Sequence, residues 1–361
     1  MATETTPRRC RSTAPATLAG ALIACVGWTA VPVAAQGPVP IGLVVPADEG
    51  RAEAMLHGAG AAVDEANARG GFRGRPFELR VVAEDGLWGQ GLSRVVGLAF
   101  DPDVAGVVGG ADGRSGHLIQ QVVTKARIPL VVPWASDFTL SRGMIPWSFQ
   151  TVPDDRQQAD AIVGHVVTAG LAGPDAPGPG LLVVGDTSYD SRRFVEALRA
   201  AAVAAGVTVR DVDTGDPADP GPGPVVVAGA SGPAAAAMDR LGRLPSPPVV
   251  YVPLRLAEDG VELAAYPAPV YRPALGGGGL PPAKGRHAVG GGPEPSLVEA
   301  LTRDAVAALI AAVREAGPDP WRVRDALARG SVDGWTGAVA FDERGRRVAD
   351  LRLVAIERRG K

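Results

Sequence analysis

The sequence predicts an α/β protein made of two Rossmann-like lobes, each with a parallel sheet flanked by helices. Three observations lead to this class. Short apolar runs alternate with helix-length segments from Val39 onward, the order typical of parallel sheets covered by helices. The same alternation begins again after residue 150. With 361 residues, 46% of them hydrophobic, the chain is long enough for two core-bearing domains of roughly 150 residues each.

In the first half, apolar residues such as Ala62 and Ala66 recur at helical spacing, and Gly70 and Gly71 end that helix. Runs rich in Val, Ile and Leu predict the strands that alternate with it. The predicted strands are 41–45, 77–82, 104–108 and 128–132, and the predicted helices are 51–68, 91–100 and 116–126.

The second half repeats this order and then ends in two helices and two strands. The predicted helices are 156–169, 190–205, 233–243, 296–316 and 320–329, and the predicted strands are 181–184, 207–212, 225–228, 249–252, 338–341 and 351–356. Two stretches, 215–224 and 273–295, are so rich in Pro and Gly that we expect loops there.

Composition excludes several classes of protein. The net charge of −3 carries no basic excess, so we expect no sequence-independent nucleic-acid surface. The four histidines are far apart in the sequence and show no metal-ligand spacing, and we expect no metal and no cofactor. The two cysteines, Cys10 and Cys25, both fall in the first segment, so the rest of the chain has no disulfide.

Residues 1–35 have the pattern of a secretory signal peptide. A positive start with Arg8, Arg9 and Arg11 precedes an uncharged stretch, 12–35, that is rich in Ala, Leu and Val. No other segment approaches the ~20 consecutive apolar residues that a membrane span requires. We therefore expect the rest of the chain to work outside the cytoplasm, in the periplasm.

Two ways of processing this segment remain open. The small residues at 33–35, just before Gln36, suit an ordinary signal peptidase. The stretch 22–25 instead resembles a lipobox, in which Cys25 would become a lipidated N-terminus and tether the protein to a membrane.

The sequence offers no set of residues for catalysis. The stretch GGADGRSG at 109–116 lacks the Lys-Ser/Thr ending of a phosphate loop and the glycine spacing of a dinucleotide site. There is no Gly-x-Ser-x-Gly elbow, and adjacent acids such as Asp154 and Asp155 more often cap helices than catalyse. We expect no enzyme.

Several blocks, in order and spacing, resemble the substrate-binding proteins of branched-chain amino-acid (leucine-binding-like) ABC importers. The matching blocks cover nearly all of 38–361 outside the two Pro/Gly-rich stretches. They include IGLVVPADEG, GAGAAVDEANARGGFRGRPFEL, VAGVVGGADGRSGHLI, IPLVVPWASDFTL, GDTSYDSRRFVEALRAAAVAAG and WRVRDALARGSVDGWTGAVAFDERGRR.

The resemblance implies the type 1 periplasmic-binding fold, in which three crossovers form a hinge between the lobes. One lobe would be 38–150 plus 272–330, and the other 151–271 plus 331–361. Such lobes close on a ligand by hinge motion. The implied partners are a small-molecule ligand and the membrane permease of the importer, and the implied state is a monomer.

The resemblance also places a ligand between the lobes. Two first-lobe loops, 110–116 and 133–137, would hold its carboxylate through backbone N–H groups and the hydroxyls of Ser115 and Ser136. Ala111 belongs to the first loop, and Gly113 would let the backbone approach closely. The alternative is that both are ordinary strand-to-helix turns.

Two aromatic residues are further candidates. Tyr189 stands where the family often has a second-lobe aromatic residue facing the ligand, or it packs at a helix start. Trp134 would stack on a ring or narrow the pocket, or it belongs to the core.

The second lobe departs from the amino-acid binders of the family. The stretch 251–255 has no acid where they carry a carboxylate for the ligand's ammonium, and Ala230, Ser231 and Gly232 replace an expected tyrosine. Because an unpaired buried ammonium is costly, we expect an acidic ligand without an amine, aromatic or not. Arg255 would offer it a planar two-donor fork, unless its side chain points to solvent.

Two functions follow from these observations. The first is a receptor that delivers its ligand to a permease, with an amino acid as the ligand of the family and an amine-free carboxylate as the better fit here. The second is an exported ligand-sensing module without a role in transport.

Overall fold

The computed structural model describes residues 37–84, 90–173, 180–212, 223–258, 261–275 and 295–357. The expected signal peptide 1–35, with Cys10 and Cys25, lies outside the described residues. So do most of the two Pro/Gly-rich stretches.

The first sheet has five parallel strands in the order β2-β1-β3-β4-β5. β1 and β2 pair in register from Val39 with Phe77 to Pro46 with Glu84. Neighbours in this sheet are not all consecutive in sequence, because helical crossovers connect parallel strands. The strands are β1 (Val39–Pro46), β2 (Phe77–Glu84), β3 (Val107–Val108), β4 (Leu130–Val132) and β5 (Ser148–Gln150).

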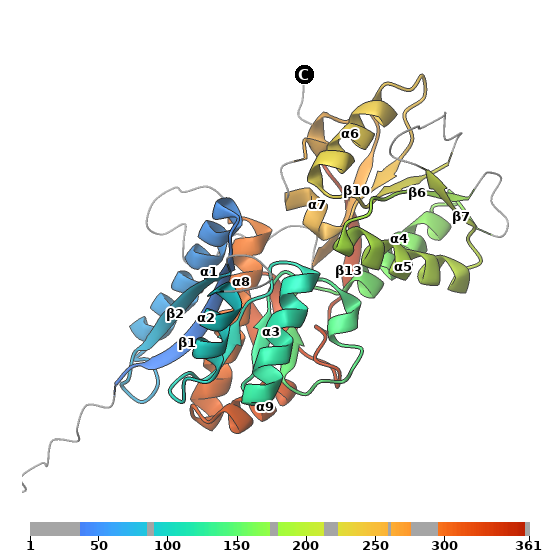
Figure 1. Cartoon of the computed structure of the whole chain (residues 1–361). Helices are drawn as coiled ribbons and strands as arrows, with labels where there is room; N and C mark the ends of the chain where they lie inside the picture. Colours follow the sequence, from blue (N-terminus) through green and yellow to red (C-terminus); the bar gives the residue numbers. More distant parts are fainter. Residues whose placement is uncertain are drawn as a thin grey trace, which may run out of the picture. The chain divides into compact units, whose positions relative to one another are not determined.

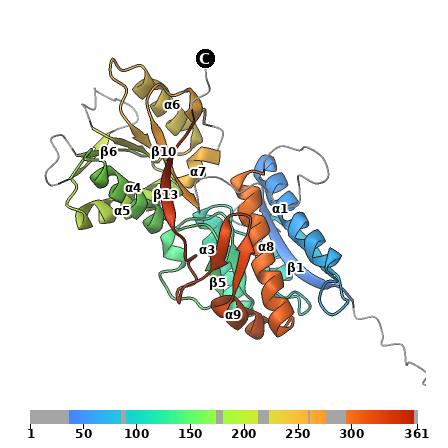
Figure 2. The ribbon, with the colours of Figure 1, turned by 180° about the vertical axis from the view of Figure 1, so that it is seen from behind.

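Helices cover both faces of the first sheet (Figure 1). Successive residues of β1 serve opposite faces, so Ile41 and Leu43 enter one core and Val44 enters the other. Figure 2 shows α1 and α8 side by side along the first of these faces. That face carries α1 (Glu49–Ala68), α8 (Leu297–Ala316) and α9 (Pro320–Arg329), and the other carries α2 (Gln90–Ala99) and α3 (Gly113–Ala126).

The second sheet has the order β13-β10-β9-β8-β6-β7 and is parallel except where β13 runs antiparallel to β10. Its strands are β6 (Leu181–Val184), β7 (Val209–Val212), β8 (Val225–Val227), β9 (Val250–Tyr251), β10 (Val270–Leu275) and β13 (Leu351–Ala355). One face packs on α4 (Asp155–Thr168) and α5 (Tyr189–Ala204), and the other on α6 (Ser231–Gly242) and α7 (Leu254–Glu258). The prediction of a two-lobed α/β fold is confirmed.

Most helices begin at a residue whose side chain accepts a hydrogen bond from a backbone N–H of the first turn. The helix itself leaves these N–H groups without a partner. Asp48 accepts a hydrogen bond from the N–H of Arg51 at the start of α1. Asp154 and Gln157 form a reciprocal capping box at the start of α4. The capping role expected for the acidic pair is thus confirmed for Asp154.

The prediction was wrong for several short elements. The strand expected at 104–108 reduces to β3, and β5, β10 and α7 were not predicted. β3 and β5 have two and three residues, too few to show a period, and Pro273 inside β10 masks its strand character.

Two contacts lie beside the expected lobe boundaries. β10 pairs with β9 at Val270 and Tyr271 and with β13 as far as Leu275, past the expected boundary at 272. The hairpin of β11 (Ser331–Gly334) and β12 (Gly337–Ala340) contacts α8 and α9, although residues after 330 were assigned to the second lobe. The reason is Asp304 of α8, which is fully buried and accepts hydrogen bonds from the N–H groups of Trp335 and Thr336.

Arg347 lies where the chain passes between the two sheets. Arg347 is 2% exposed. Its guanidinium donates hydrogen bonds to the carbonyl oxygens of Thr151 and Ala338 and to the hydroxyl of Thr336. Burial lowers its pKa to about 10, although Asp304 opposes that shift. One side chain therefore ties the segment that leaves β5 to the segment that follows β12.

Among the helices of the described residues, none combines the length and apolar character needed to cross a membrane.

Gly58 sits where α1 touches α8, and a Cβ there would overlap the carbonyl oxygen of Glu299. We expect Gly58→Ala to lower the free energy of unfolding by about 1–3 kcal/mol, because the two helix backbones would have to separate. Urea denaturation measures the change.

Gly60 provides a matched control two residues away, because a Cβ there meets no atom within 4 Å. Gly60→Ala should stabilise the protein by about 0.5–1 kcal/mol through helix propensity. Equal effects of the two substitutions would contradict the close helix contact.

Arg347→Met should lower the free energy of unfolding by at least about 3 kcal/mol, because several buried acceptors lose their donor together. Arg344→Ala, an exposed site three residues earlier, should change it by less than about 0.5 kcal/mol. Thermal and urea unfolding measure both changes. If Arg347→Met left the free energy of unfolding nearly unchanged, the hydrogen bonds of Arg347 would not stabilise the connection between these segments.

Candidate functional site

In the segment that joins β3 to the first turn of α3, backbone N–H groups donate hydrogen bonds to side chains of the same segment. The N–H of Ala111 donates to Ser115 Oγ at 3.1 Å, and the N–H of Ser115 donates to Asp112 at 2.8 Å. Gly110 takes a φ of 101°, which favours glycine. Ser115 is 3% exposed, and its hydroxyl also lowers the pKa of Glu84, which burial raises by a larger amount.

The loop after β4 turns its hydroxyl toward α4. Ser136 Oγ donates to Asp155 at 2.7 Å, and the backbone N–H of Asp155 donates back to the carbonyl of Ser136. Asp155 is 3% exposed. Burial raises the pKa of this carboxyl well above its ordinary value, and the nearby charges of Asp137 and Asp190 raise it further. Hydrogen bonding by Ser136 and the charge of Arg255 oppose the rise without cancelling it.

Asp137, in the same loop, is ionised by its surroundings. It accepts hydrogen bonds from the N–H and hydroxyl of Thr139 and lies 3.0 Å from His117 Nε2. Tyr189 of α5 donates its hydroxyl to Asp137 at 2.8 Å. Burial alone would raise the pKa of Asp137, but these partners outweigh it and hold the pKa below its ordinary value.

A second contact joins the same two lobes. The N–H of Gly113, in the first turn of α3, donates to Asp190 Oδ1 at 3.1 Å. A Cβ at Gly113 would lie 2.7 Å from that oxygen, 2.8 Å from Tyr189 Cε1 and 3.1 Å from Asp137 Cβ. Glycine is therefore required for α5 to approach this closely.

Arg255 comes from α7, beyond the end of β9. Its Nη2 donates to the carbonyl oxygen of Ala228 at 2.7 Å, and its buried Nε has no hydrogen-bond partner among the described residues. Its charge acts on both Asp155 and Asp190, lowering the pKa of each against larger opposing effects of burial. The guanidinium is partly buried and is bonded to the backbone that follows β8.

Trp134 is 5% exposed and packs in the core cluster of the first sheet, together with Phe149 and Val152. This environment agrees with the packing alternative for Trp134.

The structure brings some of the predicted residues together. Gly113 and Tyr189 meet directly, and Ser136 and Arg255 both approach Asp155. Ala111 and Ser115 bond to each other. Sequence reasoning did not assign roles to Asp137 and Asp190, whose only signal was an acid beside a helix start.

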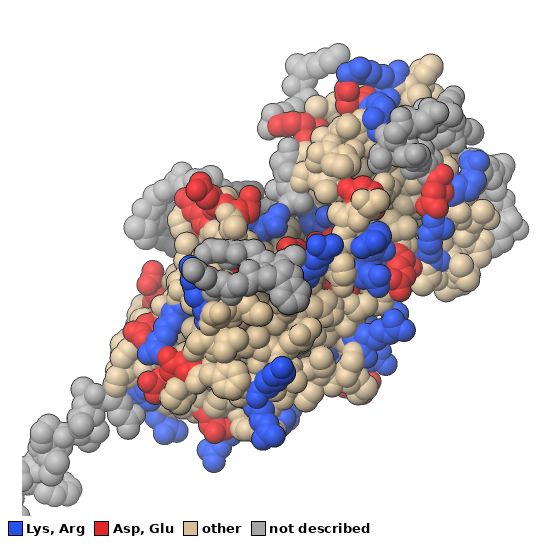
Figure 3. All heavy atoms as spheres, in the orientation of Figure 1, with Lys and Arg blue, Asp and Glu red and all other residues tan. Residues whose placement is uncertain are grey.

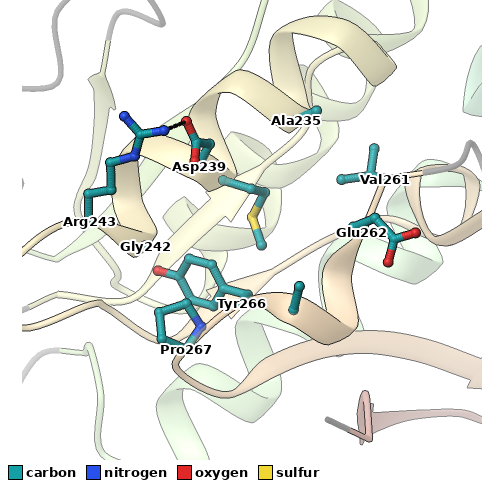
Figure 4. Close-up of a pocket in the computed structure, with 10 residues that line it drawn as sticks. Ala235, Asp239, Gly242, Arg243, Val261, Glu262, Tyr266 and Pro267 are labelled. Atoms are coloured by element: carbon teal, nitrogen blue, oxygen red, sulfur yellow. Dashed lines mark hydrogen bonds and ion pairs between the residues drawn. The ribbon is translucent and has the colours of Figure 1, made fainter. Parts of the chain in front are cut away.

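The pocket of about 320 Å³ in Figure 4 lies elsewhere in the second lobe, between α6 and the short helix η2 (Leu263–Ala265). Met238 and Tyr266 line it, and the ion pair of Asp239 and Arg243 stands at its edge. None of the predicted site residues lines this pocket.

Charged side chains of both signs are interspersed on the face shown in Figure 3. In the part of the chain that the structure describes, no group of three or more His, Cys, Asp or Glu side chains could hold a metal ion.

Asp155→Asn and Asp137→Asn should change stability in opposite directions. The raised pKa of Asp155 means that wild-type protein loses stability as pH rises from the unfolded carboxyl pKa, about 4, toward the folded value. Asparagine cannot ionise, so the advantage of Asp155→Asn should grow between pH 4 and pH 7. Urea denaturation at several pH values measures it.

Asp137 has a lowered pKa, so its contribution is present above about pH 4 and is lost as pH falls through the folded value. Asp137→Asn should therefore cost about 1.5–3 kcal/mol at pH 7 and less in acid. If both variants shifted stability in the same direction at pH 7, the assigned charge states would be wrong.

Solved structures similar to this chain are two-lobed binding proteins. An ABC transporter substrate-binding protein from Desulfitobacterium hafniense in complex with Leu has a TM-score of 0.72 at 16% identity, covering 89% of this chain and 98% of that one. A branched-chain amino acid transporter substrate-binding protein from Streptococcus pneumoniae with isoleucine has a TM-score of 0.68 at 20% identity, covering 88% and 100%. A solute-binding protein of an ABC transporter from R. palustris with benzoate has a TM-score of 0.68 at 18% identity, covering 89% and 96%.

Comparison with curated proteins finds no match to this sequence. A family model described as "Periplasmic binding protein" matches residues 38–238, which is more than half of the 361 residues. The chain therefore belongs to the periplasmic binding protein family.

Proposed function

We propose that this chain is the exported solute-binding protein of an ABC importer, which closes its lobes on a small ligand and delivers it to a membrane permease. The observation that carries the proposal is the meeting of the two lobes beyond the strand ends, where Gly113 contacts Asp190 and Asp137 contacts Tyr189. In open parallel sheets, ligands bind outside the carboxyl ends of the strands. Membership of the periplasmic binding protein family supports the same role.

The ligand that fits this site best is a small carboxylate without an amine. An ammonium group needs a free negative charge, but Asp137 already has several donors and Asp155 is disposed to be neutral. Arg255 supplies a positive charge that acts on Asp190, the acceptor of the Gly113 N–H, and its Nε donor is unpartnered among the described residues. Ser115 and Ala111 would shape this loop, and Tyr189 would line the far side.

The solved structures similar to this chain contain ligands both with and without an amine. Two of them are named with leucine or isoleucine and one with benzoate, which carries a carboxylate and no amine. Among these compounds benzoate has the chemistry proposed for this chain.

The proposal contains no catalytic step. The acidic groups at the strand ends accept hydrogen bonds from Ser136, Thr139, Tyr189 and Gly113, and the proposal gives these contacts a structural role. Residues 1–35 would direct export, after which the protein acts as a monomer outside the cytoplasm, free or tethered through Cys25.

Benzoate should raise the melting temperature of the purified protein, and leucine and isoleucine should not. A ligand at 100 times its Kd stabilises the folded state by about 2.7 kcal/mol, a shift that a thermal scan resolves. Arg255→Met should weaken benzoate binding about tenfold or more, because the carboxylate loses a charged donor.

Arg243→Ala removes a cation from an exposed ion pair in the same lobe and should leave benzoate binding unchanged. Stabilisation by leucine without stabilisation by benzoate would overturn the proposed ligand class.

A further inference from the structure

Asp190 stands at the start of α5 and reaches across to the first lobe. Its Oδ1 accepts the N–H of Gly113 at 3.1 Å, although 77 residues separate the two in sequence. The neighbouring Tyr189 makes the parallel contact to Asp137 at 2.8 Å. The first turn of α5 therefore carries two consecutive side chains that hold the lobes together directly.

The carboxylate of Asp190 has charged groups around it on several elements. Arg255 of α7 is its positive neighbour, and Asp112 and Asp137 of the first-lobe loops are negative ones. The charge of Asp190 in turn raises the pKa of Asp155 of α4, whose largest cause is burial. Burial first, and then Asp112 and Asp137, raise the pKa of Asp190, against the effects of Arg255 and Gly113.

The position of Asp190 has two features of a carboxylate subsite. A backbone N–H donor, Gly113, and a guanidinium, Arg255, act on one anionic group. There is also no spare room on the loop side, since even a methyl group on Gly113 would lie 2.7 Å from the Asp190 oxygen. A ligand carboxylate cannot reach this N–H while Asp190 holds it.

We infer that Asp190 is an internal competitor for the ligand's carboxylate: it takes the N–H of Gly113, under the electrostatic influence of Arg255, keeps the lobes in contact, and must be displaced when ligand binds. This inference rests on the proposed function. Asp190 then sets specificity, because only a ligand that offers an equivalent anion to the same donors compensates for displacing it. It also lowers apparent affinity, because part of the binding free energy is spent on opening the contact.

The test measures shape without ligand and affinity with benzoate. Asp190→Ala removes the contact, and Asp190→Asn keeps the size of the side chain but removes its charge. In small-angle X-ray scattering, ligand-free Asp190→Ala should have a larger radius of gyration than wild type. Titration calorimetry should show about tenfold tighter benzoate binding in Asp190→Ala, with Asp190→Asn between it and wild type.

Asp211→Asn is the matched control. It removes one negative charge from the same lobe, at an exposed ion pair with Arg199 on α5, and should match wild type in both measurements. An unchanged radius of gyration in both Asp190 variants, or weaker benzoate binding in them, would overturn the inference. If no variant binds benzoate, the proposed ligand class fails, and the scattering result still decides whether Asp190 holds the lobes together.

Discussion

The buried guanidinium of Arg347 is the interaction on which the relation between the two lobes depends. It donates to Thr151, just after β5, and to Thr336 and Ala338, at the hairpin that packs on α8. Its own carbonyl accepts a hydrogen bond from Gln157 of α4. Arg347 therefore links the hairpin of the first lobe, through its side chain, to the segment after β5 and, through its carbonyl, to α4 of the second lobe. Such a joint permits hinge motion while each apolar core stays packed.

The strand ends combine carboxyl groups with opposite tendencies. Asp137 is surrounded by donors and is held ionised, whereas Asp155 is buried with one hydroxyl donor and favours its neutral form. Arg255 offsets part of the remaining charge. The number of acidic residues near a site is therefore a poor guide to its negative charge. Here Asp137 already accepts several hydrogen bonds, and burial opposes ionisation of Asp155.

Close packing and specificity are connected at Gly113. The missing side chain lets Tyr189 and Asp190 approach α3, and that approach lets a protein carboxylate take the N–H that a ligand would use. Under the proposed function, the ligand would be selected by exchange of one anion for another. The energetic cost of opening the lobe contact and the selectivity for a carboxylate then have the same source.

The elements of the fold were predictable where local pattern decides them. α1, α4 and α5 begin and end within about two residues of the positions that helical periodicity predicted, because capping and apolar spacing are local properties. β10 was missed because Pro273 and the Pro/Gly-rich stretch that follows masked its strand character. The contact of the β11–β12 hairpin with α8 was not visible in the sequence because its partner, Asp304, lies some 30 residues away.

The sequence by itself determined the two-lobed α/β class and the loops at the strand ends. Order and spacing of apolar segments, glycines and helix caps suffice for that. Only the tertiary structure decided the charge of each carboxyl and which donors are taken. Those properties depend on burial and on contacts such as Gly113 with Asp190, which join residues far apart in the chain.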